Sequence, residues 1–217
     1  MRHFLELDWS SQDLRDLLQL AVDLKQEWKN GGNKPVLQGK ILAMVFQKPS
    51  LRTRFSFEVG MQHLGGHAIY LGPDEIGLGK RESVPDVARV LSGYAQGIMA
   101  RVFAHSDVVE LANWSKVPVI NGLSDDHHPC QAMADILTIY EHFGRLEGLK
   151  WAYIGDGNNV AASSLFAAAH FGLDFATATP SQYRIPAAMV EAATPLMQRN
   201  EISFEQYENP VDAARDA

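Results

Sequence analysis

The sequence predicts an α/β protein made of two doubly wound parallel-sheet domains, of which the second is incomplete. Along the whole chain, short apolar segments alternate with helical segments, which is typical of a parallel sheet covered on both faces. A glycine-bounded segment at 144–148 separates a longer first series of these units from a shorter second series. We therefore expect a first domain over residues 1–146 and the beginning of a second domain over residues 147–217.

Capping and breaking residues place the elements of the first domain. Ser10 with Asp13 resembles a capping box that begins a helix, and Gly31-Gly32-Asn33 ends it. Ser83 with Asp86 marks another helix start. The turn-rich, charged residues 72–82 before it predict an exposed loop. Apolar runs predict strands over 40–46, 67–71, 98–103 and 117–120. Helical spacing predicts the connecting helices 51–64, 83–95, 107–115 and 128–143.

The second series shows the same alternation over a shorter length. We expect strands over 149–154, 174–179 and 202–206. We expect helices over 159–171 and 186–199, and a last helix that opens at Asn209-Pro210. A sheet of about three strands is small for an open α/β domain, so the sequence predicts that this chain holds only part of that domain.

Composition and charge exclude several classes of protein. The chain has 217 residues, a formal net charge of -7 and a pI near 5.6, which argues against a general binder of nucleic acid or anionic membranes. Cys130 is the only cysteine, so an intrachain disulfide is excluded and a reducing compartment is expected. No apolar run reaches the roughly 20 residues of a bilayer span, and the N-terminus lacks a signal-peptide pattern. These observations predict a cytoplasmic protein.

Residues Ser50-Leu51-Arg52-Thr53-Arg54 are the most informative stretch of the chain. They lie between a buried strand and the start of a helix, where unpaired backbone N–H groups and the helix dipole favour an anion. Arginine adds a planar fork that matches phosphate. A net acidic chain that gathers hydroxyls and guanidiniums here is expected to bind an anionic, phosphorylated ligand. The alternative is a capped surface helix with solvated arginines.

Further polar residues follow the other predicted strands, where ligands of open α/β sheets bind. Arg101 lies in an apolar strand and needs an anionic partner, unless it reaches solvent from a strand edge. His128 precedes Pro129 at a helix start, where a neutral imidazole can donate to a substrate oxygen or can cap the helix. Gln131 is one turn into that helix, and its alternative is an exposed amide.

Three other patterns predict neither a metal, nor a nucleophilic cysteine, nor a dinucleotide cofactor. The adjacent residues 125–128, Asp-Asp-His-His, seldom close a metal shell, so we expect no metal site. Cys130 has no histidine and acid at a recognisable spacing and is interpreted as a small buried hydrophobe. The run from Gly155 to Val160 lacks the third glycine of a dinucleotide fingerprint. Its asparagines are better explained as groups that bind a small polar ligand, or, for Asn158, as a helix N-cap.

Taken in order, these segments resemble the ornithine carbamoyltransferases, within the aspartate/ornithine carbamoyltransferase superfamily. The matching stretches are 46–54, 86–91, 117–125, His128 to Gln131 with Ala134-Asp135, and 155–159. The Gly-Asp-Gly-Asn-Asn run favours the ornithine branch over the aspartate-specific relatives. The resemblance implies transfer of a carbamoyl group from carbamoyl phosphate to the δ-amine of L-ornithine, giving L-citrulline and phosphate, in arginine biosynthesis or in the reverse catabolic direction.

The resemblance also implies roles for individual residues. Ser50, Leu51, Arg52 and Thr53 would hold the phosphate, while Arg101, His128 and Gln131 would contact the carbamoyl group. Arg101 and His128 would polarise its carbonyl, and Asn159 would bind the amino-acid end of ornithine. The chemistry would need no metal and no cofactor, and the protein would form a homotrimer.

Two features depart from the family pattern. Many members have glutamine or histidine at the position of Gly77, in a loop that reaches the neighbouring subunit's site, so that contact is either absent or supplied by Lys80 or Arg81. The family's later segments, including a Ser-Met-Gly loop, a His-Cys-Leu-Pro segment and a helix that packs back on the first domain, do not occur in these residues. Two alternatives therefore stay open. One is a carbamoyltransferase for another amine, such as an acylated ornithine or putrescine, and the other is an inactive fragment that binds carbamoyl phosphate.

Overall fold

The computed structural model describes all residues 1–217, which form two compact units. Unit 1 comprises Met1–Leu5 and Asp23–Asp125, and unit 2 comprises Glu6–Val22 and Asp126–Ala217. The first helix, α1 (Ser11–Lys29), contributes residues to both units. None of the helices has the length and apolar character that a membrane span requires.

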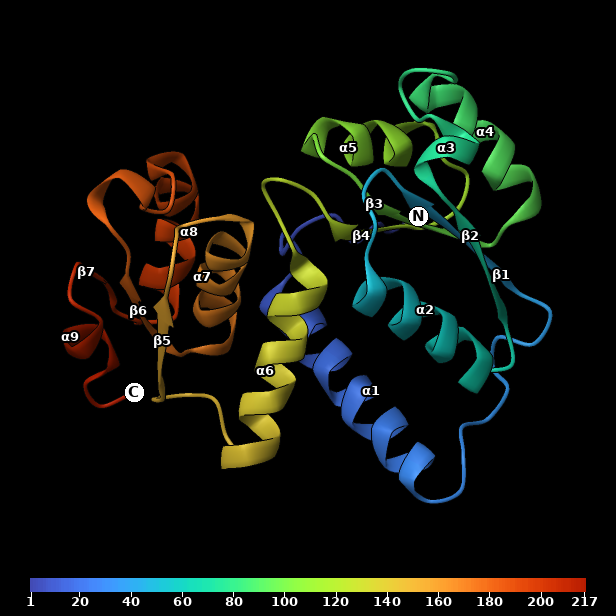
Figure 1. Ribbon diagram of the computed structural model, residues 1–217. Helices are drawn as coiled ribbons and strands as arrows, with labels where there is room; N and C mark the ends of the chain where they lie inside the picture. The colour runs from blue at the N-terminus through green and yellow to red at the C-terminus, as the bar shows by residue number, and fades with distance from the viewer. The chain divides into compact units, whose positions relative to one another are not determined.

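Unit 1 contains a four-stranded parallel sheet in the order β2-β1-β3-β4 (Figure 1). Its strands are β1 (Ile41–Phe46), β2 (His67–Leu71), β3 (Gly97–Arg101) and β4 (Val119–Leu123). Its helices, besides the end of α1, are α2 (Leu51–His63), α3 (Pro73–Ile76), α4 (Val84–Tyr94) and α5 (His105–Trp114). Phe4, near the N-terminus, forms an isolated parallel bridge with Ile120 of the edge strand β4.

Alternating side chains of the strands bury both faces of this sheet, as period-two geometry requires. Ala43 and Val45 of β1 pack in one cluster with residues of α3, α4 and α5. Leu42, Met44 and Phe46 of the same strand pack in another cluster with residues of α2 and β2. The carboxyl ends of the central strands β1 and β3 are therefore held between two layers of helices.

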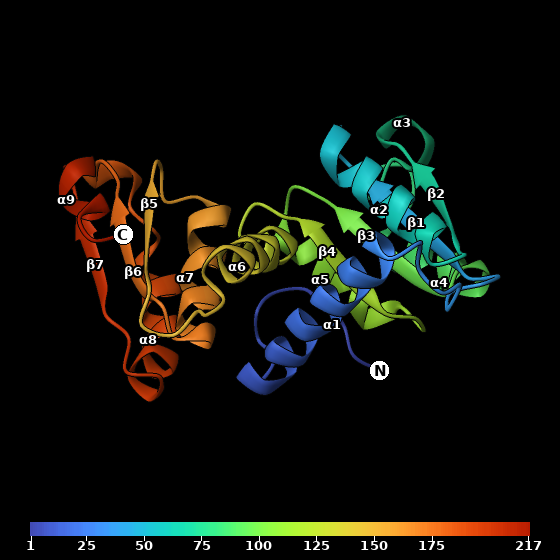
Figure 2. The same cartoon turned by 90° about the horizontal axis from the view of Figure 1, so that it is seen from below.

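Unit 2 contains a three-stranded parallel sheet in the order β5-β6-β7. Its strands are β5 (Lys150–Ile154), β6 (Asp174–Ala178) and β7 (Phe204–Tyr207). Its helices are α6 (Pro129–Phe143), α7 (Asn159–Phe171), α8 (Ala187–Arg199) and α9 (Pro210–Ala214), with a 3₁₀ turn at Ser181–Tyr183. The sheet of this unit lies between α9 on one face and α7 on the other (Figures 1 and 2). The predicted fold class, parallel α/β in both parts, is confirmed.

The structure corrects the predicted exposed loop at 72–82. Residues Pro73–Ile76 form the short helix α3, and Leu78 pairs with Glu82 in an isolated bridge. Ile76 and Leu78 are buried in the cluster that also contains Val84. These two apolar side chains pack the segment against the core. The local composition, mostly charged and turn-forming residues, did not indicate this packing. Other predicted boundaries differ by up to three residues, most at β4, which was expected over 117–120.

A buried histidine ties the N-terminal piece of unit 2 to helix α7. His170 is almost fully buried, with its Nε2 2.9 Å from the carbonyl oxygen of Leu7 and its Nδ1 2.9 Å from Ser11 Oγ. A neutral ring satisfies both bonds, because Nε2–H donates to the carbonyl and Nδ1 accepts from the hydroxyl. Burial lowers the pKa of His170, and the positive charges of Arg15 and Arg199 lower it further against the opposing effects of Leu7 and Asp8.

This lowered pKa predicts an acid-sensitive contact. An unfolded histidine has a pKa near 6.5, so protons bind the unfolded chain more readily than folded His170. The contribution of this group to stability is therefore complete above pH about 6.5 and is lost as the pH falls below that value toward the folded pKa. We expect the melting temperature of the wild type to fall more between pH 7.5 and 5.5 than that of His170→Gln, whose amide keeps a donor and an acceptor. Equal pH dependence of the two proteins would contradict the assignment.

Candidate anion-binding and catalytic site

The N-terminus of α2 forms the first part of the site. Ser50 is in extended conformation at the N-cap, and its Oγ accepts a hydrogen bond of 3.3 Å from the N–H of Thr53. The first turn of α2 contains no acidic residue, so its positive dipole end is not compensated by a side-chain carboxylate. Leu51 is 81% exposed and its side chain is apolar. The group that Leu51 can offer to an anion is therefore its backbone N–H, which has no partner within the helix. The predicted anion site therefore has the expected helix-terminus geometry.

Arg101 reaches the same turn from the end of β3. It pairs in register with Phe46, the last residue of β1, and its Nη1 donates to Thr53 Oγ1 at 3.2 Å. Its Nε is buried and has no hydrogen-bond partner. Burial, and secondarily the charge of Arg52, lower the pKa of the Arg101 guanidinium. Two guanidiniums that repel each other and one unsatisfied buried N–H are the environment that a bound anion would relieve.

The two arginines of the α2 turn have different surroundings. Arg54 donates to Glu58 at 2.9 Å one turn along α2, and its guanidinium lies 4.1 Å from the centre of the Tyr70 ring. The side chain of Arg52 makes no hydrogen bond or ion pair within the chain, and the residue is exposed. Arg52 is thus the guanidinium available to a ligand, whereas Arg54 is engaged with helix α2 and strand β2.

Helix α6 in unit 2 begins with the next predicted residues. His128 occupies the N-cap position, yet its side chain does not cap the helix, and its backbone N–H donates to Ser163 Oγ at 2.8 Å. Gln131 is exposed, and its Nε2 donates to Asp135 Oδ1 at 2.9 Å. Burial raises the pKa of Asp135, and the bond from Gln131 opposes that rise. The imidazole of His128 therefore does not cap the helix, contrary to the capping alternative. The amide of Gln131 is exposed, as its alternative expected, and it is hydrogen-bonded to Asp135.

Helix α7 in unit 2 begins at the asparagine pair. Asn158 is the N-cap, and its Oδ1 accepts from the N–H groups of Val160 at 2.9 Å and Ala161 at 3.3 Å. The N-cap alternative is thereby confirmed for Asn158, and Asn159 is the first residue of α7. Cys130 is partly buried, and burial raises the pKa of its thiol to about 12, which disfavours a nucleophilic thiolate.

The structure places the predicted site residues in both units. Ser50, Leu51, Arg52, Thr53 and Arg101 lie in unit 1, where the hydrogen bond from Arg101 to Thr53 brings the strand end and the helix turn together. His128, Gln131 and Asn159 lie in unit 2, at the beginnings of α6 and α7. Sequence reasoning missed Gln47 and Lys48, whose side chains bind the neighbouring strand-end loops of unit 1.

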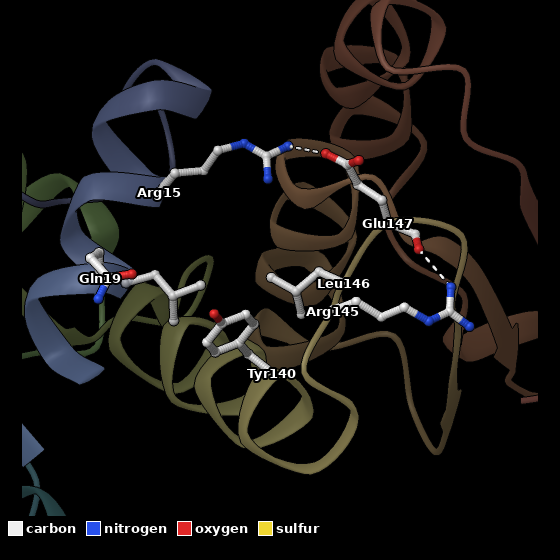
Figure 3. Close-up of a pocket in the computed structure, with 7 residues that line it drawn as sticks. Arg15, Gln19, Tyr140, Arg145, Leu146 and Glu147 are labelled. Atoms are coloured by element: carbon white, nitrogen blue, oxygen red, sulfur yellow. Dashed lines mark hydrogen bonds and ion pairs between the residues drawn. The ribbon is translucent and has the colours of Figure 1, made fainter. Parts of the chain in front are cut away.

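Two cavities outside this constellation do not suit a phosphorylated ligand. One of about 310 Å³ in unit 2 is lined by Arg15, Tyr140, Arg145 and Glu147, among others (Figure 3). Both arginines are already bound to Glu147, Arg15 to its carboxylate at 3.1 Å and Arg145 to its backbone oxygen at 3.1 Å. Another of about 600 Å³ in unit 1 lies beside α2 and is lined mainly by apolar side chains. Neither contains a predicted site residue.

Comparison with known proteins decides the family. Two protein-family models match the chain. One, described as "Aspartate/ornithine carbamoyltransferase, carbamoyl-P binding domain", matches residues 2–141. The other, described as "Aspartate/ornithine carbamoyltransferase, Asp/Orn binding domain", matches residues 147–217. The chain belongs to the aspartate/ornithine carbamoyltransferase family. Both parts of the resemblance seen in the sequence, the phosphate turn and the Gly-Asp-Gly-Asn-Asn run, lie within the matched ranges.

Individual members of this family are similar over nearly the whole chain. The ornithine carbamoyltransferase of Anoxybacillus flavithermus is 49% identical over 217 residues, covering 100% of this chain and 69% of that protein. That of Pyrococcus abyssi is 48% identical, covering 97% of this chain and 66% of that protein. The structure of ornithine carbamoyltransferase from Pyrococcus furiosus matches with a TM-score of 0.97 at 46% identity, covering 100% of this chain and 69% of the other. The chain thus spans about two thirds of the length of these relatives.

Proposed function

We propose that this chain belongs to an ornithine carbamoyltransferase, which transfers the carbamoyl group of carbamoyl phosphate to the δ-amine of L-ornithine. Its similarity to proteins of that name and the geometry of the α2 turn support the proposal. The main supporting observation is that the guanidiniums of Arg52 and Arg101 lie near each other at the first turn of α2. Arg52 has no partner, and Arg101 is bonded to Thr53 with its buried Nε unsatisfied. We also propose that residues 1–146 form the carbamoyl-phosphate domain and residues 147–217 form part of the ornithine domain.

The proposed chemistry follows from the residues at hand. Ser50, Leu51, Arg52 and Thr53 bind the phosphate through hydroxyls, backbone N–H groups and a guanidinium. The unprotonated δ-amine of ornithine attacks the carbamoyl carbon, and a C–N bond forms while the carbonyl oxygen takes up negative charge. Arg101 and His128 stabilise this oxyanion, and Gln131 orients the carbamoyl group. The C–O bond to phosphate then breaks, phosphate leaves with the electron pair, the nitrogen loses a proton, and L-citrulline results.

Binding of ornithine is assigned to Asn159 by the same proposal. Asn159 is the first residue of α7 and follows the N-cap Asn158, and its amide would bind the amino-acid end of the substrate. The protein contributes positioning and electrostatic stabilisation and needs neither a metal nor another cofactor for this reaction. We propose a cytoplasmic role in arginine biosynthesis; one relative, from Pyrococcus furiosus, carries the name "Ornithine carbamoyltransferase, anabolic".

A citrulline assay tests the proposed function. The 217-residue protein is incubated with carbamoyl phosphate and, in separate reactions, ornithine, N-acetylornithine or putrescine, and carbamoylated product is quantified. Citrulline formed from ornithine supports the proposal. Product formed only with another amine would assign the protein to a different carbamoyltransferase. Carbamoyl-phosphate binding without any product would leave it a binding module.

We further propose that the protein forms a homotrimer through unit 1. Helix α2 has no buried residue and exposes Leu51 and Phe55, and the edge strand β2 exposes Ile69. Near this edge, Arg81 donates to the backbone oxygen of Glu75, while Lys80 makes no hydrogen bond or ion pair through its side chain and is free to contact a neighbouring subunit. Sedimentation velocity is expected to show a trimer, and a monomer across the micromolar range would contradict this assembly.

A further inference from the structure

Gln47 is the first residue after β1 and lies three positions before the N-cap of α2. Its backbone N–H donates to the carbonyl oxygen of Arg101 at 2.9 Å, which extends the pairing of β1 with β3 by one residue. The guanidinium of that same Arg101 bonds Thr53. Gln47 therefore begins the loop that carries the phosphate turn and is joined directly to the backbone of the arginine that meets it.

The side chain of Gln47 binds the turn that follows Arg101. Its Oε1 accepts from the N–H of Phe103 at 2.8 Å, and its Nε2 donates to Asp107 Oδ2 at 2.8 Å in the first turn of α5. Gln47 itself is half-buried. Three hydrogen bonds from one residue thus bind the chain from position 101 to position 107.

The amide of Gln47 matches the chemistry of both contacts. One partner is a donor, the N–H of Phe103, and the other is an acceptor, the carboxylate of Asp107. Only a side chain with both an acceptor and a donor at its end satisfies the two together. A glutamate would hold the first bond but would bring a second carboxylate against Asp107.

We propose that Gln47, with Asp107, is a positioning residue that holds the Arg101 guanidinium beside the α2 turn, in place to contact the carbamoyl group of a ligand whose phosphate the turn binds. This inference rests on the proposed function, because it assumes that Arg101 contacts the carbamoyl group. Arg101 is the last residue of β3, where the pairing of β3 with β4 shifts register between Ala100 and Arg101. On that side the N–H of Val102 donates to the carbonyl oxygen of Leu123 at 2.9 Å, and on the β1 side Gln47 holds both the backbone of Arg101 and the turn that follows it. Loss of a hydrogen bond from a charged group typically weakens ligand binding by about 10- to 100-fold.

Calorimetric titration of wild type, Gln47→Glu and the double variant Gln47→Glu/Asp107→Asn with carbamoyl phosphate and with inorganic phosphate tests this role. In the double variant, the new asparagine amide can donate to the new glutamate carboxylate, so the lost bond is remade with its polarity reversed. Gln47→Glu is expected to bind carbamoyl phosphate about 10- to 100-fold more weakly while phosphate affinity changes less than about 3-fold, because Arg101 serves the carbamoyl group and the α2 turn serves the phosphate. The double variant is expected to recover most of the loss.

The outcomes separate this inference from the function on which it rests. A wild type that fails to bind carbamoyl phosphate would overturn both. A wild type that binds, together with unchanged affinity in Gln47→Glu, equal losses for the two ligands or no recovery in the double variant, would overturn the positioning role alone. Titrations are done well below the melting temperature of each variant, so that lower stability by itself does not change the affinity. If Gln47→Glu does not fold, Gln47→Met removes both side-chain bonds without adding charge and carries the same expectation.

Discussion

Replacing Arg52 by alanine is expected to weaken carbamoyl-phosphate binding by at least about 100-fold, because a bidentate, charge-assisted pair with phosphate is lost. Arg52 makes no hydrogen bond or ion pair within the chain through its side chain, so its removal breaks no internal contact of that kind. It also removes a positive charge that repels the Arg101 guanidinium, whose pKa is lowered first by burial and secondarily by Arg52. The affinity is measured by isothermal titration calorimetry, with the melting temperature expected to stay near that of the wild type.

Arg54→Ala is the matched control, because it removes the same side chain two positions along the same helix turn. Arg54 is bound to Glu58 and stacked on Tyr70, so its loss is expected to lower stability by up to about 1 kcal/mol while affinity changes less than about 3-fold. Equal losses of affinity in the two variants would show that the turn binds phosphate through charge in general and not through Arg52. Unchanged affinity in Arg52→Ala would remove the residue from the site.

The distinction between these two arginines marks how far the sequence leads. The strand-to-helix turn and its capped start follow from local rules, and the structure has both, with Ser50 as the N-cap. The anion preference follows from the same rules and stays a prediction. The pairing of Arg54 with Glu58 is also local, since the two are four residues apart on one helix. The stacking of Arg54 on Tyr70 is not, because Tyr70 belongs to the next strand and meets α2 only when the sheet forms.

Other parts of the site depend on tertiary contacts in the same way. Sequence spacing identified Arg101 as a residue that needs a partner, but not that Thr53 is the partner. Gln47 lies within the matching stretch 46–54 but received no role, because a glutamine after a strand looks like a solvated loop residue until Phe103 and Asp107 lie beside it. In the pair Asn158-Asn159, either residue can cap a helix, and only the observed helix start assigns that role to Asn158.

Gly157→Ala is expected to lower the free energy of unfolding of unit 2 by about 2–3 kcal/mol, because a side chain at this position has no room. A Cβ built on Gly157 would lie 2.1 Å from the backbone nitrogen of Ile185 and 2.4 Å from the carbonyl carbon of Arg184. Both contacts are with backbone atoms, so the segment 181–185 would have to move as a whole. The N–H of Gly157 also donates to the carbonyl oxygen of Tyr183, and that bond would be disturbed. Urea denaturation measures the loss.

Gly144→Ala in the same unit separates this steric effect from the general cost of losing a glycine. Gly144 has a φ of +67° and nothing within 4 Å of a built Cβ, so only the strain of a left-handed residue, about 1 kcal/mol, is expected. Equal losses in the two variants would contradict the steric explanation. The comparison also bears on the Gly-Asp-Gly run, which in a dinucleotide-binding protein lets the backbone approach a pyrophosphate. Here the protein's own backbone at 183–185 fills the space beside the second glycine. Close packing of the chain just before α7, which begins at Asn159, therefore requires glycine at position 157.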